Sequence, residues 1–315
     1  MKFSRFRELY RTFGADIAFS ALIASRFWRA SHLKHKCILR YLKAHYSGFI
    51  ADYADRPSIS QTGSYIPVIW SMWWQGTENL PDVVKICYSS FRKYCGAHPV
   101  KVLTRENFTD YVDLPGYIFD RVASGAITIT HLSDIARFYL LYHYGGLWLD
   151  STIFITNGIP DSVFEADYYT VKRILTPRNR NVAQDRWTNF LHAAKKGNAL
   201  CGFVLDFFLE YWRTQNTLID YFLIDYAINI AYEELPECRK ILDAVPYVNY
   251  DLYRLENIMN REYSPEEWEA LKNSTHFSKL AWRKPGRKTT LSGRQTIFAH
   301  LLAEAERNSN HEVQA

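Results

Sequence analysis

The segment that most constrains the fold of this chain covers residues 131–152 and reads HLSDIARFYLLYHYGGLWLDST. Apolar side chains recur there at three- and four-residue spacing, which predicts a helix with one apolar face: Leu132, Ile135, Tyr139 and Tyr142. Gly145 and Gly146 predict the end of this helix, because glycine adopts a left-handed backbone without steric cost. Residues 147–149 then predict a buried strand, with Asp150 at its carboxyl end. Open α/β sheets bind ligands at that end of their strands, so the segment predicts a fold class and the place of a site.

Two further strands extend this α/β pattern. Residues 66–70 and 98–103 predict buried strands, and residues 81–94 between them predict a helix. A strand-helix-strand unit of this length implies parallel strands. We therefore predict a mostly parallel, Rossmann-like sheet flanked by helices. Helical periodicity is strong again from residue 199 onward and predicts a helical C-terminal half.

The chain of 315 residues divides into three predicted parts. Residues 1–55 form a helical extension, residues 56–300 hold the α/β domain, and residues 301–315 form a polar tail. Residues 52–63, which contain Pro57 and several small polar side chains, predict a linker between the first two parts.

The first fifty residues are strongly basic. They hold ten Lys and Arg against two acidic residues, a balance of +8, whereas the whole chain carries only +5. Aromatic and aliphatic side chains between Phe3 and Leu22 approximate a helical stripe. Such a basic amphipathic helix is typical of segments that lie on anionic lipid, and it equally fits a solvated helix packed on the domain. Peripheral membrane contact through residues 1–50 is therefore one of two interpretations.

Cysteine spacing, apolar runs and known binding motifs indicate the cellular compartment of the protein and exclude some classes of partner. The five cysteines are scattered and show no metal-ligand spacing, which fits a reducing cytoplasm better than a disulfide framework. No signal peptide is evident, and no early apolar run reaches the roughly 18 to 20 residues that cross a bilayer. No nucleic-acid-binding motif is present, so we expect no nucleic-acid partner.

The segment SDIARFYLLYHYGGLWLDST resembles the SDxxRxxxLYxxGGxxxDxD signature of sugar-nucleotide glycosyltransferases with the GT-A fold. The resemblance is to the DxD sugar-binding family (family 32), and within it to the capsular polysaccharide synthesis branch. It extends through GNALCGFVLDFFLEYW and LIDYFLIDYAI to HFSKLAWR, and so covers roughly residues 66 to 283. One departure is clear: Asp-x-Asp is replaced by Asp150-Ser151-Thr152, so the second carboxylate is absent.

The resemblance implies roles for three residues. It implies that Asp134 contacts the donor sugar, that Arg137 contacts the sugar or the diphosphate, and that Asp150 contacts the ribose and the metal region. A purely structural interpretation is also open. In it, Asp134 is a carboxylate favoured by the helix dipole, Arg137 is its ion-pair partner, and Asp150 is a turn residue.

Further donor-binding candidates come from neighbouring segments. The strand at 66–70 and the loop after it resemble the family's IPxxIWQxWxxG opening, whose aromatic residues can stack on uracil or simply fill the core. Arg105 leaves the carboxyl end of the second predicted strand. The full set of additional candidates is Trp70, Trp74, Gln75, Arg105, Gly145, Gly146 and Lys279.

The resemblance implies a divalent cation, Mn²⁺ or Mg²⁺. Such a cation prefers hard oxygen ligands and accepts waters and phosphate oxygens beside them. Asp150 is the first candidate ligand, while Asp225 and His276 are candidates for the missing one, although each also has an ordinary structural explanation. Lys279 offers an alternative, because its point charge can neutralise a leaving diphosphate without a metal.

These observations predict a glycosyltransferase at the cytoplasmic face of a membrane. It would transfer a hexose from a UDP-sugar to a glycan or lipid-linked glycan acceptor in cell-surface polysaccharide synthesis, and the resemblance implies retention of configuration. The alternative is a catalytically inactive protein of the same fold that serves as an assembly partner at the membrane. The loss of the second carboxylate and the basic N-terminal region support that alternative.

Overall fold

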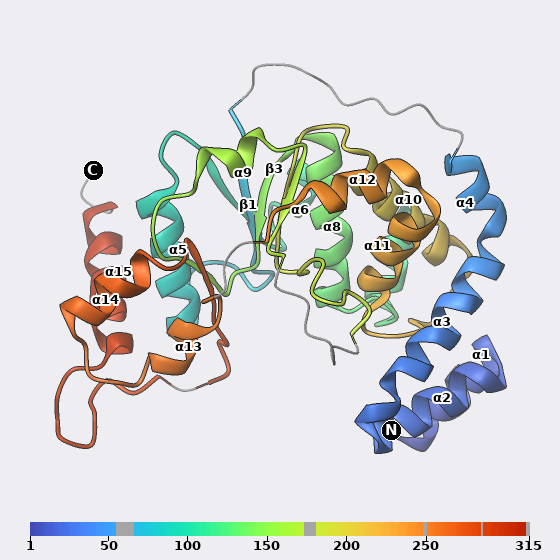
Figure 1. Ribbon diagram of the computed structural model, residues 1–315, viewed down its shortest axis with the longest axis horizontal. Coiled ribbons are helices and arrows are strands. Elements are labelled where there is room, and N and C mark those ends of the chain that lie inside the picture. The colour runs from blue at the N-terminus through green and yellow to red at the C-terminus, as the bar shows by residue number, and fades with distance from the viewer. Residues whose placement is uncertain (55–65, 173–180, 248–250, 285, 313–315) are drawn as a thin grey trace.

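The computed structural model describes residues 1–54, 66–172, 181–247, 251–284 and 286–312, and its centre is a five-stranded sheet (Figure 1). The strand order is β2-β1-β3-β6-β5. Four strands run in one direction and β6 runs against them. The strands are β1 (Ile69–Met72), β2 (Val100–Leu103), β3 (Gly146–Leu149), β5 (Tyr168–Thr170) and β6 (Leu191–Ala194). The predicted α/β fold with a mostly parallel sheet is confirmed.

Helices cover both faces of this sheet. The helix α5 (Asp82–Tyr94) packs on one face, and α8 (Ile129–His143) with α10 (Ala199–Thr214) packs on the other. Side chains alternate between the two faces along a strand, so Leu147 and Leu149 join the core beneath α5 while Trp148 joins the core beneath α8. The other helices of this part are α6 (Phe108–Tyr111), α7 (Gly116–Ala123), α9 (Asp161–Glu165), α11 (Leu223–Glu234) and α12 (Pro236–Ala244).

The N-terminal region is helical, as predicted, but it is not one helix. Gly14 has a φ of 89° and separates α1 (Phe3–Phe13) from α2 (Ala15–Arg26), and a short turn leads to α3 (Ser31–His45) and α4 (Ser47–Ala54). The α3 helix packs on α11, and Lys34 of α3 pairs at 2.7 Å with Asp220, which precedes α11. Figure 1 shows these helices along one side of the molecule. Within the described ranges, no helix is long and apolar enough to cross a membrane.

The C-terminal region forms a small unit beside the main sheet. Its strand β7 (Phe277–Lys279) pairs antiparallel with β4 (Ile153–Ile155), which follows β3. The helices here are α13 (Arg254–Ile258), α14 (Pro265–Lys272) and α15 (Ile297–Glu312). The prediction of a polar tail over 301–315 is wrong for its described part. Three apolar side chains of that part of α15 are buried in the core that α15 shares with α5: Leu301, Leu302 and Ala305.

Several predicted boundaries shift in the structure. The strands predicted at 66–70 and 98–103 begin later, at Ile69 and Val100, and the connecting helix begins at Asp82. The predicted linker at 52–63 lies outside the described residues after Ala54, where α4 ends. The strand β6 was not predicted, because its four residues are all buried and show no alternation.

The double-glycine turn joins α8 to β3 as predicted. Gly145 and Gly146 have φ angles of 71° and 104°, and the Gly145 amide donates to the carbonyl oxygens of Leu140 and Leu141. A Cβ atom on Gly146 would lie 2.2 Å from the carbonyl oxygen of Val68, which precedes β1. Glycine at position 146 therefore allows β3 to approach the chain at β1 and aligns Asp150 with the end of β1.

A Gly146→Ala substitution is expected to destabilise the protein by about 3 kcal/mol or more, since strain at positive φ and a backbone clash add together. Gly125→Ala is the matched control. Gly125 also has a positive φ, of 78°, but nothing lies within 4 Å of the place that a Cβ atom would take there, so only about 1 to 2 kcal/mol is expected. Urea unfolding measures both, and equal losses would contradict the close-approach argument.

Candidate functional site

A cavity of about 590 Å³ opens at the carboxyl ends of β1 and β3. Its walls come from the loop after β1, one face of α8, the turn after β3 and the segment that contains β7. Six of the predicted site residues line it: Trp74, Gln75, Asp134, Arg137, Asp150 and Lys279. The structure therefore brings together residues that are up to 205 positions apart in the sequence.

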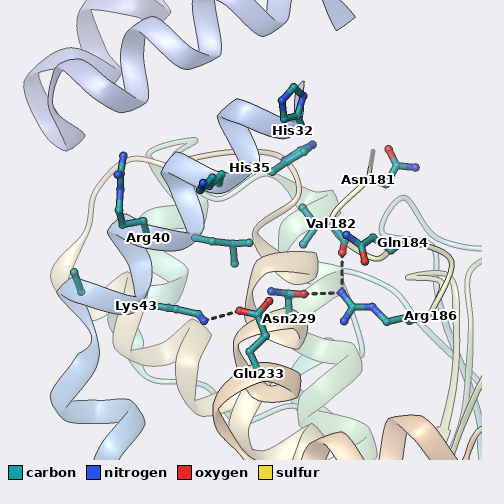
Figure 2. Close-up of a pocket in the computed structure, with 13 residues that line it drawn as sticks. His32, His35, Arg40, Lys43, Asn181, Val182, Gln184, Arg186, Asn229 and Glu233 are labelled. Atoms are coloured by element: carbon teal, nitrogen blue, oxygen red, sulfur yellow. Dashed lines mark hydrogen bonds and ion pairs between the residues drawn. The ribbon is translucent and has the colours of Figure 1, made fainter. Parts of the chain in front are cut away.

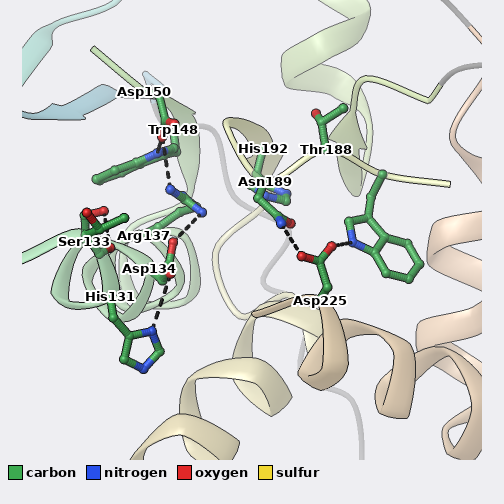
Figure 3. A network of polar contacts seen from close by, with 12 residues as sticks. His131, Ser133, Asp134, Arg137, Trp148, Asp150, Thr188, Asn189, His192 and Asp225 are labelled. Atoms are coloured by element: carbon green, nitrogen blue, oxygen red, sulfur yellow. Dashed lines mark hydrogen bonds and ion pairs between the residues drawn. The ribbon is translucent and has the colours of Figure 1, made fainter. Parts of the chain in front are cut away.

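The Arg137 guanidinium lies between the two carboxylates (Figure 3). Its Nη2 donates to Asp150 Oδ1 at 3.0 Å, and its Nη1 lies 3.1 Å from Asp134 Oδ1. The same group stacks over the Trp148 ring at 5.1 Å, and only 3% of the side chain is exposed. A buried cation of this kind requires its partners, since removal of one partner from a buried pair typically costs about 3–5 kcal/mol.

Asp134 is held in place from the side of α10. Trp212 Nε1 donates to His131 Nε2 at 2.8 Å, which leaves the proton of neutral His131 on Nδ1. That nitrogen lies 3.4 Å from Asp134 Oδ2 and so donates to it. The chain of contacts from Trp212 through His131 orients one carboxylate oxygen, and Arg137 orients the other.

Asp150 is the more open carboxylate. Its Oδ1 accepts a second hydrogen bond from Trp148 Nε1 at 3.0 Å, and its backbone amide donates to Phe190 O. About a third of the side chain is exposed to the cavity. Asp150 therefore has a fixed orientation and a side chain that is partly open to the cavity.

The expected metal position holds a cation of the protein itself. The Lys279 ammonium donates to Thr152 Oγ1 and lies 3.7 Å from Asp150 Oδ2. A divalent ion at this place would need several oxygen ligands at short range and would be repelled by the ammonium. Among the described residues, no group of three or more His, Cys, Asp or Glu side chains is arranged to hold a metal. The groups beside Asp150 are thus the Thr152 hydroxyl and the Lys279 ammonium, and the Mn²⁺ or Mg²⁺ ion stays a prediction.

The two other candidate metal ligands lie apart from Asp150. His276 Nδ1 contacts Gly158 O at 2.7 Å, and His276 precedes β7, whose Lys279 end is the one that lines the cavity. Asp225 lines a separate, smaller cavity, where it accepts hydrogen bonds from Trp187 Nε1 at 2.9 Å and Asn189 Nδ2 at 2.7 Å (Figure 3). The structure does not bring the three predicted ligands together.

Four of the predicted donor-binding residues do not line the cavity. Trp70 lies in β1 and is buried. Its Nε1 donates a hydrogen bond to Gly145 O at 2.9 Å, and this bond stabilises the glycine turn. Gly145 and Gly146 shape that turn and do not line the cavity. Arg105 is exposed beyond β2, also outside the cavity lining.

Sequence reasoning missed part of the lining. Asn189 and Phe190 come from the turn before β6, while Trp282 and Arg283 follow β7. The Trp282 ring meets Trp73 edge-to-face at 5.6 Å, and Arg283 stacks over Trp282 at 4.5 Å. The aromatic and basic residues of the LAWRK segment indicated a ligand-binding surface. Only the pairing of β7 with β4 shows that this surface faces the cavity.

The fold and this cluster define an α/β protein with a charged ligand site at the carboxyl ends of its parallel strands. The chain belongs to the capsular polysaccharide synthesis protein family, whose match covers residues 23–301. This match begins well before residue 66, where the predicted resemblance began. The helices α3 and α4 are therefore part of the family region.

Two curated relatives share shorter regions with the chain. The O-glycosyltransferase PaGT of Phomopsis amygdali is 31% identical over 102 residues, which cover 30% of this chain and 25% of the relative. The probable glycosyltransferase FCK3 of Fusarium pseudograminearum is 27% identical over 169 residues, covering 44% and 43% respectively. The chain thus spans less than half the length of these relatives. Among solved structures, the PaToxG glycosyltransferase is similar at a TM-score of 0.39 and 12% identity, over 78% of this chain and 99% of that one.

The buried carboxyl of Asp225 gives a pH-dependent prediction. Burial raises its pKa from 3.8 to about 6, although hydrogen bonds from Trp187 and Asn189 oppose this rise. The unfolded chain releases the proton at lower pH than the folded protein does. Ionisation therefore lowers the free energy of unfolding as the pH rises through this interval.

An Asp225→Asn variant lacks this ionisation. As the pH rises from about 4 to about 7, the unfolding free energy of the wild type should therefore fall relative to that of the variant by about 2–3 kcal/mol. Urea unfolding at a series of pH values measures it, and the subtraction cancels groups common to both proteins. A difference that stays constant over this range would mean that Asp225 titrates as in the unfolded chain.

Proposed function

We propose that this protein is a glycosyltransferase that transfers a hexose from a UDP-sugar to a glycan or lipid-linked glycan acceptor in cell-surface polysaccharide synthesis. The observation that supports this most is the charge arrangement of the 590 Å³ cavity at the strand ends. It combines oriented carboxylates, which suit sugar hydroxyls, with three cationic side chains, which suit a diphosphate: Arg137, Lys279 and Arg283.

The donor would lie across the cavity in a defined direction. The aromatic wall of Trp73, Trp74 and Trp282 suits the planar uracil base. Lys279 and Arg283 stand beside that wall, at the place that the diphosphate would occupy. Asp134 and Asp150 would then accept hydrogen bonds from hydroxyl groups of the donor.

The chemical step places charge on the diphosphate. The bond between the anomeric carbon and the phosphate oxygen breaks, and its electron pair stays on the departing nucleoside diphosphate. The acceptor hydroxyl forms the new bond to the anomeric carbon and loses its proton. The ammonium of Lys279 would stabilise the charge that develops on the leaving group, which is the task that a divalent cation performs in an Asp-x-Asp site. Retention of configuration stays a prediction, which NMR of the anomeric proton of the product would test.

Stabilisation of the diphosphate by Lys279 and stabilisation by Mn²⁺ or Mg²⁺ predict opposite effects of a chelator on activity. If Lys279 serves the diphosphate, donor hydrolysis or transfer should survive a chelator within about twofold, and Lys279→Gln should lower kcat/KM by about 100-fold or more. Lys101→Gln, on the exposed side of β2, is the matched control and should change neither. Activity that a chelator abolishes and Mn²⁺ restores would favour the metal instead.

The Asp150 carboxylate can be tested without disturbing its neighbours. Asp150→Asn keeps an oxygen that accepts from Arg137 and Trp148, but it removes the charge. We expect activity to fall by at least about 100-fold while a UDP thermal shift persists. If neither the wild type nor any variant responds to UDP or turns over a UDP-sugar, the inactive assembly partner becomes the better interpretation.

The proposed location is the cytoplasmic face of a membrane, with peripheral contact through the N-terminal helices. Seven large apolar side chains within the first 33 residues are exposed among basic ones: Met1, Phe3, Tyr10, Phe19, Ile23, Phe27 and Leu33. An exposed apolar and basic surface of this kind suits an anionic lipid interface. Deletion of residues 1–50 would not test this cleanly, because Leu9, Ile38 and Leu42 belong to the main core.

Point substitutions in the full chain give a sharper test. Phe3→Ser, Phe19→Ser and Phe27→Ser together should weaken binding to phosphatidylglycerol vesicles by at least about tenfold, since each ring contributes apolar burial. UDP binding and the melting temperature should change little, because these rings are exposed in the folded protein. Unchanged vesicle binding, measured by flotation, would contradict the membrane interpretation.

A further inference from the structure

A second cavity, of about 810 Å³, lies between the N-terminal helices and the α/β core (Figure 2). One wall is the face of α3 that carries Lys36, Arg40 and Lys43. The opposite wall is formed by residues 181–186 and by α11, through Asn229 and Glu233. This cavity is separate from the proposed donor site, and the proposed donor chemistry does not use its residues.

The lining of this cavity is strongly cationic. Four Lys and Arg side chains face it against a single carboxylate, that of Glu233, which pairs with Lys43 at 2.5 Å. Lys36 and Arg40 lie one turn apart on α3 and are both exposed. Burial lowers the pKa of His35 to about 4, so that ring is neutral near pH 7. The positive charge of the lining therefore comes from its Lys and Arg side chains.

Arg186 is held rigidly at the inner end of the cavity. Its hydrogen bonds to described residues all go to neutral oxygens, among them Asn229 Oδ1 at 2.7 Å and Val182 O at 3.1 Å. The guanidinium also stacks between the rings of Trp187 and Tyr232, at 4.7 and 4.4 Å. Glu233 and Asp243 attract this charge electrostatically, but its described hydrogen bonds go to neutral oxygens. A fixed guanidinium of this kind is a ready partner for an anion.

The backbone before Arg186 is strained in a way that supports a site. Gln184 and Asp185 have φ angles of 48° and 63°, and they are the only non-glycine residues with positive φ in the described ranges. Such conformations carry an energetic cost and concentrate where a side chain must be aimed at a ligand. Here they turn the chain so that Gln184 and Arg186 both line the cavity.

A third, smaller cavity lies between the two sites and borders both of them. This cavity of about 290 Å³ shares His35, Asn181 and Val182 with the basic cavity. It shares three other residues with the donor cavity: Asn189, Phe190 and Phe222. The three cavities are therefore neighbours, and Trp187 and the Asn189–Asp225 pair line the middle one.

We propose that the basic cavity binds the phosphate or diphosphate group of a carrier-linked glycan acceptor, whose sugar end runs through the smaller cavity to the donor site. The inference rests on the proposed transferase function and adds the chemical class of the acceptor. The position supports a lipid carrier, because α3 follows directly after the exposed apolar side chains of α1 and α2. An anion at Arg186, Lys36 and Arg40 would leave the carrier chain directed towards those helices.

Binding of inorganic pyrophosphate tests this site while the donor cavity is filled with saturating UDP. Isothermal titration calorimetry on the full chain should detect a pyrophosphate site under these conditions. Lys36→Ala with Arg40→Ala should weaken it by about tenfold or more, since two charge-assisted contacts are lost. Lys101→Ala with Lys240→Ala removes the same charge from exposed positions outside the cavity and should leave the affinity within about twofold.

Arg186 gives a second arm. Arg186→Gln should abolish pyrophosphate binding and Arg186→Lys should restore part of it, with an unchanged UDP affinity showing that each variant is folded. The proposal is overturned if UDP-saturated protein binds no pyrophosphate, or if the cavity and control pairs behave alike. It is also overturned if the cavity pair loses only phosphatidylglycerol-vesicle binding, which would make this face a general lipid surface. Failure of UDP itself to bind would instead contradict the proposed function and leave the pyrophosphate result to stand alone.

Discussion

The buried guanidinium of Arg137 is the interaction on which the rest of the site depends. It lies on α8, yet its partners include Asp150 and Trp148 at the end of β3, so it ties the helix to the strand at the ligand-binding edge. A cation with so little exposure is stable only where carboxylates and an aromatic face surround it. The arrangement therefore fixes both carboxylates before any ligand arrives, and binding does not have to supply the free energy of ordering them.

Predictions of secondary structure from the sequence were confirmed in the segment that also holds the candidate site residues. The helix, the glycine turn, the strand and the trio of Asp134, Arg137 and Asp150 all lie within 22 consecutive residues, and helical and strand periodicities place them without long-range information. Trp70 and Trp74 show the limit of this approach. Both lie in the same tryptophan-rich stretch of the sequence. Only the observed end of β1 shows that Trp70 points into the core and that Trp74 lines the cavity.

The failures share a cause, which is contact between distant segments. Residues 301–315 are mostly polar, but Leu301, Leu302 and Ala305 among them are buried. Their burial depends on α5, which lies more than 200 residues earlier in the sequence. The sequence shows that Thr152 replaces the second carboxylate, but it does not show which group lies beside Thr152 in the folded protein. Only the pairing of β4 with β7 shows that an ammonium approaches the hydroxyl that stands in its place. Charge at this position is supplied by a different part of the chain, with the opposite sign.

The small β4–β7 sheet has a consequence for the order in which the site comes into existence. Asp134, Arg137 and Asp150 are synthesised together, whereas Lys279, Trp282 and Arg283 are made more than 120 residues later. Trp212, which orients Asp134 through His131, is made 62 residues after Asp150. The wall that would attract a diphosphate is added only when β7 pairs with β4. A chain that lacks β7 therefore has only the part of the cavity built before it, and the wall of Lys279, Trp282 and Arg283 is completed near the end of the sequence.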